Sequence, residues 1–333
     1  MTGADVPWAG CDVPAPDAPL AVEAAPQSRT VGEALRLAEE ALERSFVPDP
    51  RREAAELYAA LVRRTTSAAW TDRDACVPAE LLGELCAAAR RRAAGWPQAY
   101  AAGWACFRGH WLRVDRRVLI PRPETEGLVE LVLAWARGRV PPGGVLPAGA
   151  AAAGAAPAGG PGLVAADVGT GSGAIAVALA LEGPFERVWA VDSSAGALEV
   201  AEGNVARLGV APRVSLVRGD LLEPLAGRRL DVVAGNPPYV ATAELAAVDA
   251  AVRDHEPLLA LDGGLDGLGP TRLLVAAAGG VLAPGGLLAL EVDSRRAGET
   301  AALVGTAGFC GVELRNDLFQ RPRYVTARQP GDG

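Results

Sequence analysis

The chain has 333 residues and a net charge of −8, with a pI near 5.0, and it contains no lysine, so every basic side chain is an arginine or a histidine. This length is enough for one large domain and a smaller one. The acidic charge argues against a general nucleic-acid coat, and the absence of lysine excludes Schiff-base chemistry and a lysine-containing phosphate loop.

The cysteine and histidine patterns predict neither a disulfide framework nor a metal site. Five cysteines are widely spaced and form no C-x-x-C pair, which is typical of buried side chains in a reducing compartment. The two histidines, His110 and His255, belong to no metal-binding motif. No 18-residue apolar segment and no signal-peptide pattern is evident. We therefore expect a cytoplasmic protein without a membrane span or a metal.

The first hundred residues predict a tail followed by a small helical domain. Residues 1 to 29 are rich in Pro, Ala and Asp, which favours a disordered tail. Residues 30 to 98 carry three helical patterns, which begin at a capping box at Thr30, at Asp49-Pro50 and at Pro78. Because no single helix can bury its apolar stripe alone, the three are expected to pack together.

A linker follows. Residues 99 to 126 contain short apolar runs broken by glycines, which predict a β-hairpin. The linker ends in Pro121–Glu126, and within this segment Glu124 or Thr125 is expected to cap the helix that follows. Residues 138 to 162 have low complexity, and we interpret them as a flexible surface loop without chemistry.

The remaining sequence, residues 127 to 330, alternates strand and helix patterns, which predicts a mostly parallel sheet with helices on both faces. Strands are expected at residues 164–168, 188–191, 214–217, 230–234 and 287–292, with a closing antiparallel pair at 312–315 and 324–327. Ligands of such sheets bind at the carboxyl ends of the strands.

A glycine-rich segment, Asp167–Gly173, lies between the first of these strands and a helix. Its G-x-G-x-G spacing differs from the G-x-G-x-x-G of dinucleotide binders, and glycines let the backbone approach a ligand closely. An acidic residue two positions before the first glycine suits a ligand with an ammonium and a sulfonium group. S-adenosylmethionine therefore fits better than NAD, and a structural turn is the alternative.

Two aspartates end the next strands. Asp192 could accept hydrogen bonds from ribose hydroxyls, or it could cap the following helix, as could Ser193 or Ser194. Asp220 could meet the adenine amino group, and a turn aspartate is the alternative.

The segment Asn236-Pro237-Pro238-Tyr239 ends a further strand. Prolines cannot continue an interior strand, so the chain must leave the sheet here. The Asn236 side chain and a proline carbonyl are both acceptors, and together they could hold the two hydrogens of an NH2 group. A strand-terminating turn without chemistry is the alternative.

Four segments, in this order, resemble the bacterial release factor glutamine methyltransferases: Leu119–Glu126, Asp167–Ala174, Asn236–Tyr239 and Glu256–Gly264. The resemblance runs from about residue 30 to residue 328. Members of this family methylate the glutamine of the Gly-Gly-Gln motif in peptide chain release factors. The second and third segments also occur in adenine N6, cytosine N4 and guanine N2 methyltransferases, so the first segment is the discriminating one.

The resemblance implies a class I, Rossmann-like methyltransferase domain with a mostly parallel seven-stranded sheet, preceded by a helical domain that docks the protein substrate. It assigns S-adenosylmethionine binding to Asp167, Gly169, Thr170, Gly171, Ser172, Gly173, Asp192, Asp220, Leu221 and Asn236. It assigns the substrate amide to Asn236, Pro237, Pro238 and Tyr239, of which Asn236, Pro237 and Tyr239 are the expected catalytic residues. Two positions depart from the family pattern: Leu221 is often aromatic there, and Asp293 is commonly glycine.

Other functions remain open from the sequence. A ribosomal-protein glutamine methyltransferase is a near relative. A methyltransferase of exocyclic amines in nucleic acids would use the same pocket, but it would favour a basic surface that the acidic pI does not support. A nucleotide-binding or interaction module without catalysis is the alternative from another class.

Overall fold

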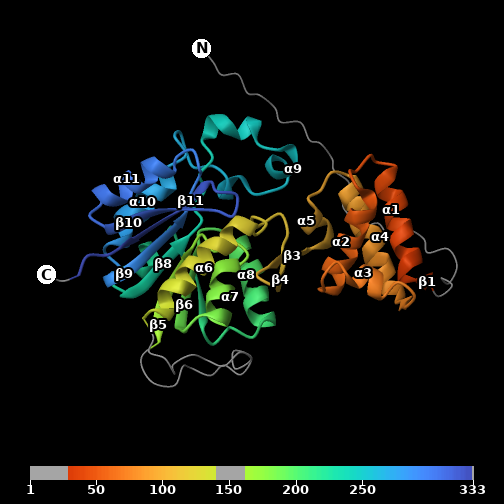
Figure 1. Cartoon of the computed structure of the whole chain (residues 1–333), viewed down its shortest axis with the longest axis horizontal. Helices are drawn as coiled ribbons and strands as arrows, with labels where there is room; N and C mark the ends of the chain where they lie inside the picture. The colour runs from red at the N-terminus through yellow and green to blue at the C-terminus, as the bar shows by residue number, and fades with distance from the viewer. Residues whose placement is uncertain (1–28, 140–161, 332–333) are drawn as a thin grey trace, which may run out of the picture.

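The computed structural model describes residues 29–139 and 162–331, which form a helical bundle and a larger α/β part (Figure 1). The tail expected over residues 1 to 29 lies outside the described residues except for Arg29. The low-complexity loop expected over residues 138 to 162 also lies outside them, except at its two ends.

The described chain begins with the helical bundle. Its elements are β1 (Arg29–Thr30), α1 (Val31–Glu43), α2 (Pro50–Val62), α3 (Ala68–Thr71), β2 (Cys76–Val77), α4 (Ala79–Ala93) and α5 (Gln98–Ala102). The capping box at Thr30 is confirmed, because its hydroxyl accepts from the Glu33 amide while the Glu33 carboxylate accepts from the Thr30 amide. The three predicted helices correspond to α1, α2 and α4, whereas α3 and α5 are additional.

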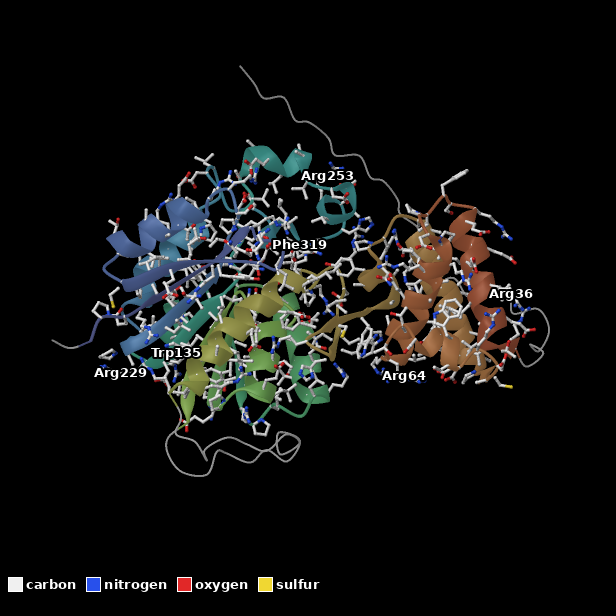
Figure 2. All side chains as sticks on the ribbon, viewed as in Figure 1. Arg36, Arg64, Trp135, Arg229, Arg253 and Phe319 are labelled. Carbon is white, nitrogen blue, oxygen red and sulfur yellow. The ribbon has the colours of Figure 1, made fainter. Side chains whose placement is uncertain are left out.

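A β-hairpin joins the bundle to the α/β part. In it, β3 (Trp104–Phe107) pairs antiparallel with β4 (His110–Arg113). The turn residues Arg108 and Gly109 both have positive φ, 50° and 78°, which gives a turn whose twist matches that of the strands. Figure 2 labels Arg64, which lies at the side of the bundle that faces this hairpin.

The linker predicted over residues 99 to 126 differs from the structure at both ends. Its first residues belong to α5, and its last residues belong to α6 (Pro123–Arg137). The prediction that Glu124 or Thr125 caps this helix is wrong: Arg122 is the N-cap and a proline is the first helical residue. Proline suits that position because its φ is already helical and its missing N–H is not needed there.

Asn204, in α8 (Ala195–Arg207), fixes the hairpin to the α/β part. Its fully buried side chain accepts from the Arg113 amide at 2.7 Å and donates to the carbonyls of Arg113 and Ser172 at 3.0 and 2.9 Å. Ser172 belongs to the glycine-rich segment. One side chain therefore connects the hairpin to the loop predicted to bind the cofactor.

We expect Asn204→Ala to lower the free energy of unfolding by about 3 kcal/mol, because it leaves one buried and two partly buried backbone groups without their partner. Urea denaturation followed by circular dichroism measures this loss. Asn316→Ala is the matched control, since Asn316 is exposed and its side chain makes no hydrogen bond in the described part of the chain. Equal stability of the two variants would contradict the role given to Asn204.

A seven-stranded sheet forms the centre of the α/β part, in the order β10-β11-β9-β8-β5-β6-β7 (Figure 1). Its strands are β5 (Leu163–Val168), β6 (Phe185–Asp192), β7 (Val214–Arg218), β8 (Leu230–Gly235), β9 (Leu282–Glu291), β10 (Cys310–Asn316) and β11 (Pro322–Arg328). Strands β5 to β9 run parallel, and β11 is antiparallel to both β9 and β10. The predicted mostly parallel sheet with a closing antiparallel pair is confirmed.

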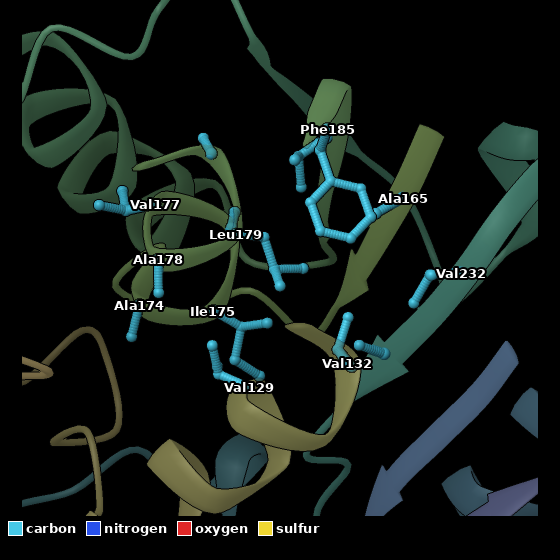
Figure 3. Packing of buried hydrophobic residues seen from close by; sticks show 14 of the residues in the cluster. Val129, Val132, Ala165, Ala174, Ile175, Val177, Ala178, Leu179, Phe185 and Val232 are labelled. Carbon is cyan, nitrogen blue, oxygen red and sulfur yellow. The ribbon is translucent and has the colours of Figure 1, made fainter. Parts of the chain in front are cut away.

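Helices cover both faces of this sheet. On one face lie α6, α7 (Ala174–Glu182) and α8, and on the other lie α10 (Gly269–Ala278) and α11 (Ala297–Thr306). Figure 3 shows the first face, where Leu179 of α7 and Phe185 of β6 are completely buried. The chain between β7 and α10 adds four short helices: η2 (Glu223–Leu225), η3 (Thr242–Ala247), α9 (Ala250–Arg253) and η4 (Leu258–Ala260).

The strand order reverses between β5 and β8. The chain continues from β5 to β6 on one side, whereas β8 leads to β9 on the other. Loops that leave such a switch point diverge and open a crevice at the carboxyl ends of the strands. This edge brings together the glycine-rich segment, Asp192 and Asn236.

Candidate active site

A pocket of about 240 Å³ opens at this edge of the sheet. Six of the predicted cofactor residues line it: Gly169, Gly171, Asp192, Asp220, Leu221 and Asn236. The other four do not line it: Asp167, Thr170, Ser172 and Gly173. Further lining comes from residues 117–119 after the hairpin and from η4, neither of which the sequence analysis assigned to the cofactor site. The pocket thus collects residues from segments that are distant in the sequence.

The glycine-rich segment forms one wall. Gly169 and Gly171 have φ of 73° and 54°, and a Cβ built on either would meet nothing within 4 Å. Their backbone therefore faces open space, as a ligand-binding turn requires. The side chains between the glycines point the other way, since Thr170 and Ser172 are buried.

Asp167 is a buried carboxylate with one oxygen left unbonded. Its Oδ2 accepts from the Thr170 hydroxyl at 2.6 Å and from the Ala176 amide at 3.0 Å, while Oδ1 has no hydrogen-bond partner. Burial raises the pKa of this carboxyl to about 7. A cationic group beside Oδ1 would supply the missing partner and favour the ionised form. Asp167 therefore fits the ammonium-bearing ligand that the sequence predicts.

Asp192 lies in the wall and braces the glycine-rich segment. Its two oxygens accept from the amides of Gly171 and Ser194, each at 2.9 Å. The capping role considered for Asp192 belongs to Ser194, whose hydroxyl accepts from the Ala197 amide. Because a carboxylate has about four acceptor positions, Asp192 retains two for a ligand in the pocket.

Asp220 and Leu221 follow β7 and line the pocket. Asp220 is exposed, so its carboxylate is free to meet a polar group. Leu221 has a positive φ of 45°, which is uncommon for a residue other than glycine, and it is half-buried. Its side chain gives the pocket an apolar surface at the position where an aromatic residue is common in the family.

The segment Asn236–Tyr239 closes the pocket after β8. Asn236 and Pro238 line the pocket, and Pro237 is buried behind them. Burial, together with the negative charge of Glu291, raises the pKa of Tyr239 to about 12, so its hydroxyl stays protonated. The Pro237 carbonyl accepts no hydrogen bond from the described part of the chain, which leaves it available to a donor.

A hydrogen-bonded chain behind Asn236 was not predicted. The Thr125 hydroxyl donates to Glu291 Oε2 at 2.7 Å and accepts from Asn236 Nδ2 at 3.3 Å. An ionised carboxylate can only accept, so the Thr125 proton points to Glu291 and the Thr125 oxygen receives the Asn236 N–H. This arrangement leaves Asn236 Oδ1 free. Burial raises the pKa of Glu291 to about 7, and its Oε1 has no partner.

An ion pair connects the first and the fourth of the segments that carry the resemblance. Arg122 pairs with the buried Glu256 at 2.5 Å, and this carboxylate also accepts from the Ile120 amide. A separate ion pair, outside those segments, involves Asp293, one of the two positions that depart from the family pattern. Although burial opposes its ionisation, hydrogen bonds from Arg295 hold its pKa below the usual range. Asp293 is therefore a compensated charge outside the pocket lining.

Residues 29–139 and 162–331 contain no group of three or more His, Cys, Asp or Glu side chains placed to hold a metal ion. In the same residues, no helix has both the length and the apolar character needed to cross a membrane.

Comparison with known proteins identifies the family. Residues 33–103 match the family model described as PrmC N-terminal domain, and residues 161–266 match the one described as Methyltransferase small domain. A release factor glutamine methyltransferase from Moorella thermoacetica is 46% identical over 212 residues, which cover 64% of this chain and 67% of that protein. One from Cereibacter sphaeroides is 39% identical over 254 residues, which cover 76% and 82%. The chain belongs to the release factor glutamine methyltransferase family.

The predicted family, the methyltransferase class and S-adenosylmethionine as its cofactor are confirmed. A ribosomal protein uL3 glutamine methyltransferase from Bordetella pertussis is also similar, with 41% identity over 201 residues that cover 60% of each chain.

Proposed function

We propose that this protein methylates the side-chain amide nitrogen of the glutamine in the Gly-Gly-Gln motif of peptide chain release factors, in the cytoplasm. The observation that carries the proposal is the orientation of Asn236, whose Nδ2 is bonded to Thr125 and whose Oδ1 is left for a donor beside the cofactor pocket. A site that offers acceptors suits a substrate NH2 group.

The residues present fit S-adenosylmethionine. Asp167 Oδ1 would accept from its ammonium group, Asp192 from its ribose hydroxyls and Asp220 from its adenine amino group, with Leu221 against the adenine ring. Gly169 and Gly171 leave the space that the ligand needs. The cofactor, when bound, supplies a methyl group made electrophilic by the sulfonium.

The chain's own residues orient the nucleophile. An amide nitrogen is a poor nucleophile because its lone pair is delocalised into the carbonyl group. Asn236 Oδ1 and the Pro237 carbonyl would accept its two N–H bonds, fix its direction and favour positive charge on nitrogen. Tyr239 would pack on the amide plane, with Pro238 lining the site. This is catalysis by positioning and electrostatics, without a general base before transfer.

The release factor is preferred over the alternatives for two reasons. Most of the similar proteins described above act, by their names, on release factors, and Pro121–Glu126 supplies both Thr125 and Arg122 to the site. The net charge of −8 disfavours a nucleic-acid substrate. The helical bundle, residues 30 to 98, is proposed to dock the protein substrate.

We expect Asp192→Ala to weaken S-adenosylmethionine binding by about 10- to 100-fold, since hydrogen bonds to a charged group contribute about 1.5–3 kcal/mol and 1.4 kcal/mol is tenfold. The variant also loses the acceptor that holds the Gly171 amide. Isothermal titration calorimetry measures the change. Asp74→Ala in the bundle, where Asp74 is exposed, is the matched control. Unchanged affinity would remove Asp192 from the cofactor site.

Methyl transfer from labelled S-adenosylmethionine tests the function. Separate reactions contain a release factor, the same factor with its Gly-Gly-Gln glutamine replaced by alanine, ribosomal proteins, RNA and DNA. We expect label only in the intact release factor, at that glutamine by mass spectrometry. Label mainly in a ribosomal protein or in nucleic acid would overturn the proposed substrate.

A further inference from the structure

Three arginines surround the Trp104 side chain where the bundle, the hairpin and α8 meet. Their guanidinium carbons lie 4.9, 4.8 and 5.0 Å from the centroid of the indole ring, for Arg63, Arg113 and Arg207 respectively. Arg63 follows α2, Arg113 ends β4 and Arg207 ends α8. All three are exposed. We call these three arginines and Trp104 the Trp104 cluster.

The positive charge of the Trp104 cluster is not neutralised. In the described ranges, none of its arginines forms an ion pair with a carboxylate. Neighbouring arginines do: Arg64 pairs with Asp72 at 2.5 Å, and Arg108 pairs with Glu182 at 2.6 Å. The three guanidiniums lie within about 10 Å of one another, about one Debye length at 0.1 M salt, so they repel. Burial and this repulsion both lower the pKa of Arg207.

An oxyanion would relieve the repulsion, and the surroundings favour carboxylates over phosphates. The planar guanidinium fork binds either group. However, single-stranded RNA gains much of its affinity by stacking bases on aromatic rings. Trp104 is only 8% exposed, and its ring is already covered by guanidiniums, so it offers no such surface.

We propose that the Trp104 cluster docks an acidic surface segment of the folded protein substrate. This proposal rests on the proposed function, and it adds a second place on the enzyme where the substrate is bound, away from the glutamine. Cations contributed by the bundle, the hairpin and α8 would then recognise a single partner, and its binding would hold these three elements in their observed arrangement.

The cluster is too far from the pocket for a short peptide to reach. Helix α8 is capped by Ser194, which lines the pocket, and it ends at Arg207. Its 13 residues span about 20 Å at 1.5 Å per residue. A five-residue peptide with its glutamine in the pocket extends about 7 Å to either side. A folded substrate can contact both places, whereas such a peptide contacts only the pocket.

The test compares the variant Arg63→Gln/Arg113→Gln/Arg207→Gln with wild type on two substrates, a folded release factor and a five-residue peptide centred on its Gly-Gly-Gln glutamine. The matched control is Arg187→Gln/Arg228→Gln/Arg229→Gln, which removes the same charge. Arg187 and Arg228 stack on Trp189, and Figure 2 shows Arg229 at the edge of the α/β part that is far from the bundle and Arg64.

For the cluster variant we expect a KM for the folded factor at least tenfold higher, an unchanged kcat, and unchanged kinetics on the peptide. The increase in KM should shrink at high salt, because exposed charge pairs are screened. The control should behave as wild type. Thermal melting and S-adenosylmethionine affinity check that the variant folds.

An unchanged KM for the folded factor would overturn the inference while wild-type methylation upheld the proposed function. No methylation of either substrate by wild type would instead overturn the proposed function. In that case calorimetry measures the binding of the folded factor to the two variants. Weaker binding by the cluster variant than by the control would support the inference, and equal binding would overturn it. Loss of RNA binding with unchanged factor binding would show that the partner is RNA and would overturn the stated partner.

Discussion

Replacing Asn236 with alanine should leave S-adenosylmethionine binding within a few-fold of wild type and slow methyl transfer by about 10³-fold, the scale seen when one oriented group is removed from a reacting centre. The substituted side chain lies in the pocket wall, where it offers only Oδ1 to a donor because Thr125 holds its Nδ2. Loss of that acceptor frees the substrate amide to rotate.

Two measurements on the Asn236→Ala protein separate binding from transfer. Calorimetry gives the affinity for S-adenosylmethionine, and single-turnover kinetics with saturating cofactor gives the rate of transfer. Turnover close to wild type would remove Asn236 from the catalytic set. A large loss of cofactor affinity would instead reassign it to cofactor binding.

The second large effect is expected at Thr125. Thr125→Val keeps the shape but removes the hydroxyl that links Asn236 to Glu291. Leaving buried polar groups unpaired costs about 1–3 kcal/mol each, and a freely rotating Asn236 amide presents Nδ2 to the substrate part of the time. We expect kcat to fall by about 10- to 100-fold with little change in the KM for S-adenosylmethionine. Thr125→Ser should restore most of the rate, because serine retains the hydroxyl.

A substitution at Glu291 tests the direction of the hydrogen bonds at Thr125 more directly. In Glu291→Gln, a side-chain N–H can donate to Thr125, whose proton is then free to donate to Asn236 Oδ1 and turn that amide around. We expect Glu291→Gln to lose as much kcat as Thr125→Val. If Thr125→Ser had the activity of the wild type and Glu291→Gln were also fully active, this direction of hydrogen bonding would be contradicted.

The pH dependence follows from the pKa of Glu291, which burial raises to about 7 from its ordinary value of 4.5. Below pH 7 the protonated Glu291 carboxyl can donate a hydrogen bond, and the fixed direction of the hydrogen bonds from Asn236 to Glu291 is lost. Wild-type kcat should therefore rise with pH through about 7, and the kcat of Glu291→Gln should depend less on pH.

The contribution of Glu291 to stability should change with pH in the opposite direction. The folded state binds more protons than the unfolded state between pH 4.5 and 7, so this group's contribution to the free energy of unfolding falls as pH rises there.

The fold could be predicted where a pattern is local. Apolar runs that end in glycines or prolines predicted β5 and β8, and the capping box predicted α1. Helix α11 was missed because its sequence, Ala297–Thr306, mixes glycines and threonines with small apolar residues and shows a weak stripe. One-turn helices such as α3 and α5 are too short to show periodicity.

The site could be predicted only in part, because some of its contacts join distant parts of the chain. Sequence position alone placed Asp192 and Asn236 at strand ends, and both line the pocket. Thr125 and Glu291 are 166 residues apart in sequence, and no local sequence pattern at either residue predicts the hydrogen bond between them. For Asp167 the sequence indicated a charged partner, but only the structure shows that Oδ1 lies buried and unbonded.

The Asn204 side chain has a consequence for how the two substrates influence each other. It holds the Arg113 backbone of the hairpin and the Ser172 carbonyl of the glycine-rich segment at once, so a shift at either end changes the free energy at the other. Coupling of this kind is reciprocal. Any factor by which bound cofactor increases the affinity of the protein for its protein partner must equal the factor by which that partner increases the affinity for the cofactor. Asn204→Ala should bring both factors toward one.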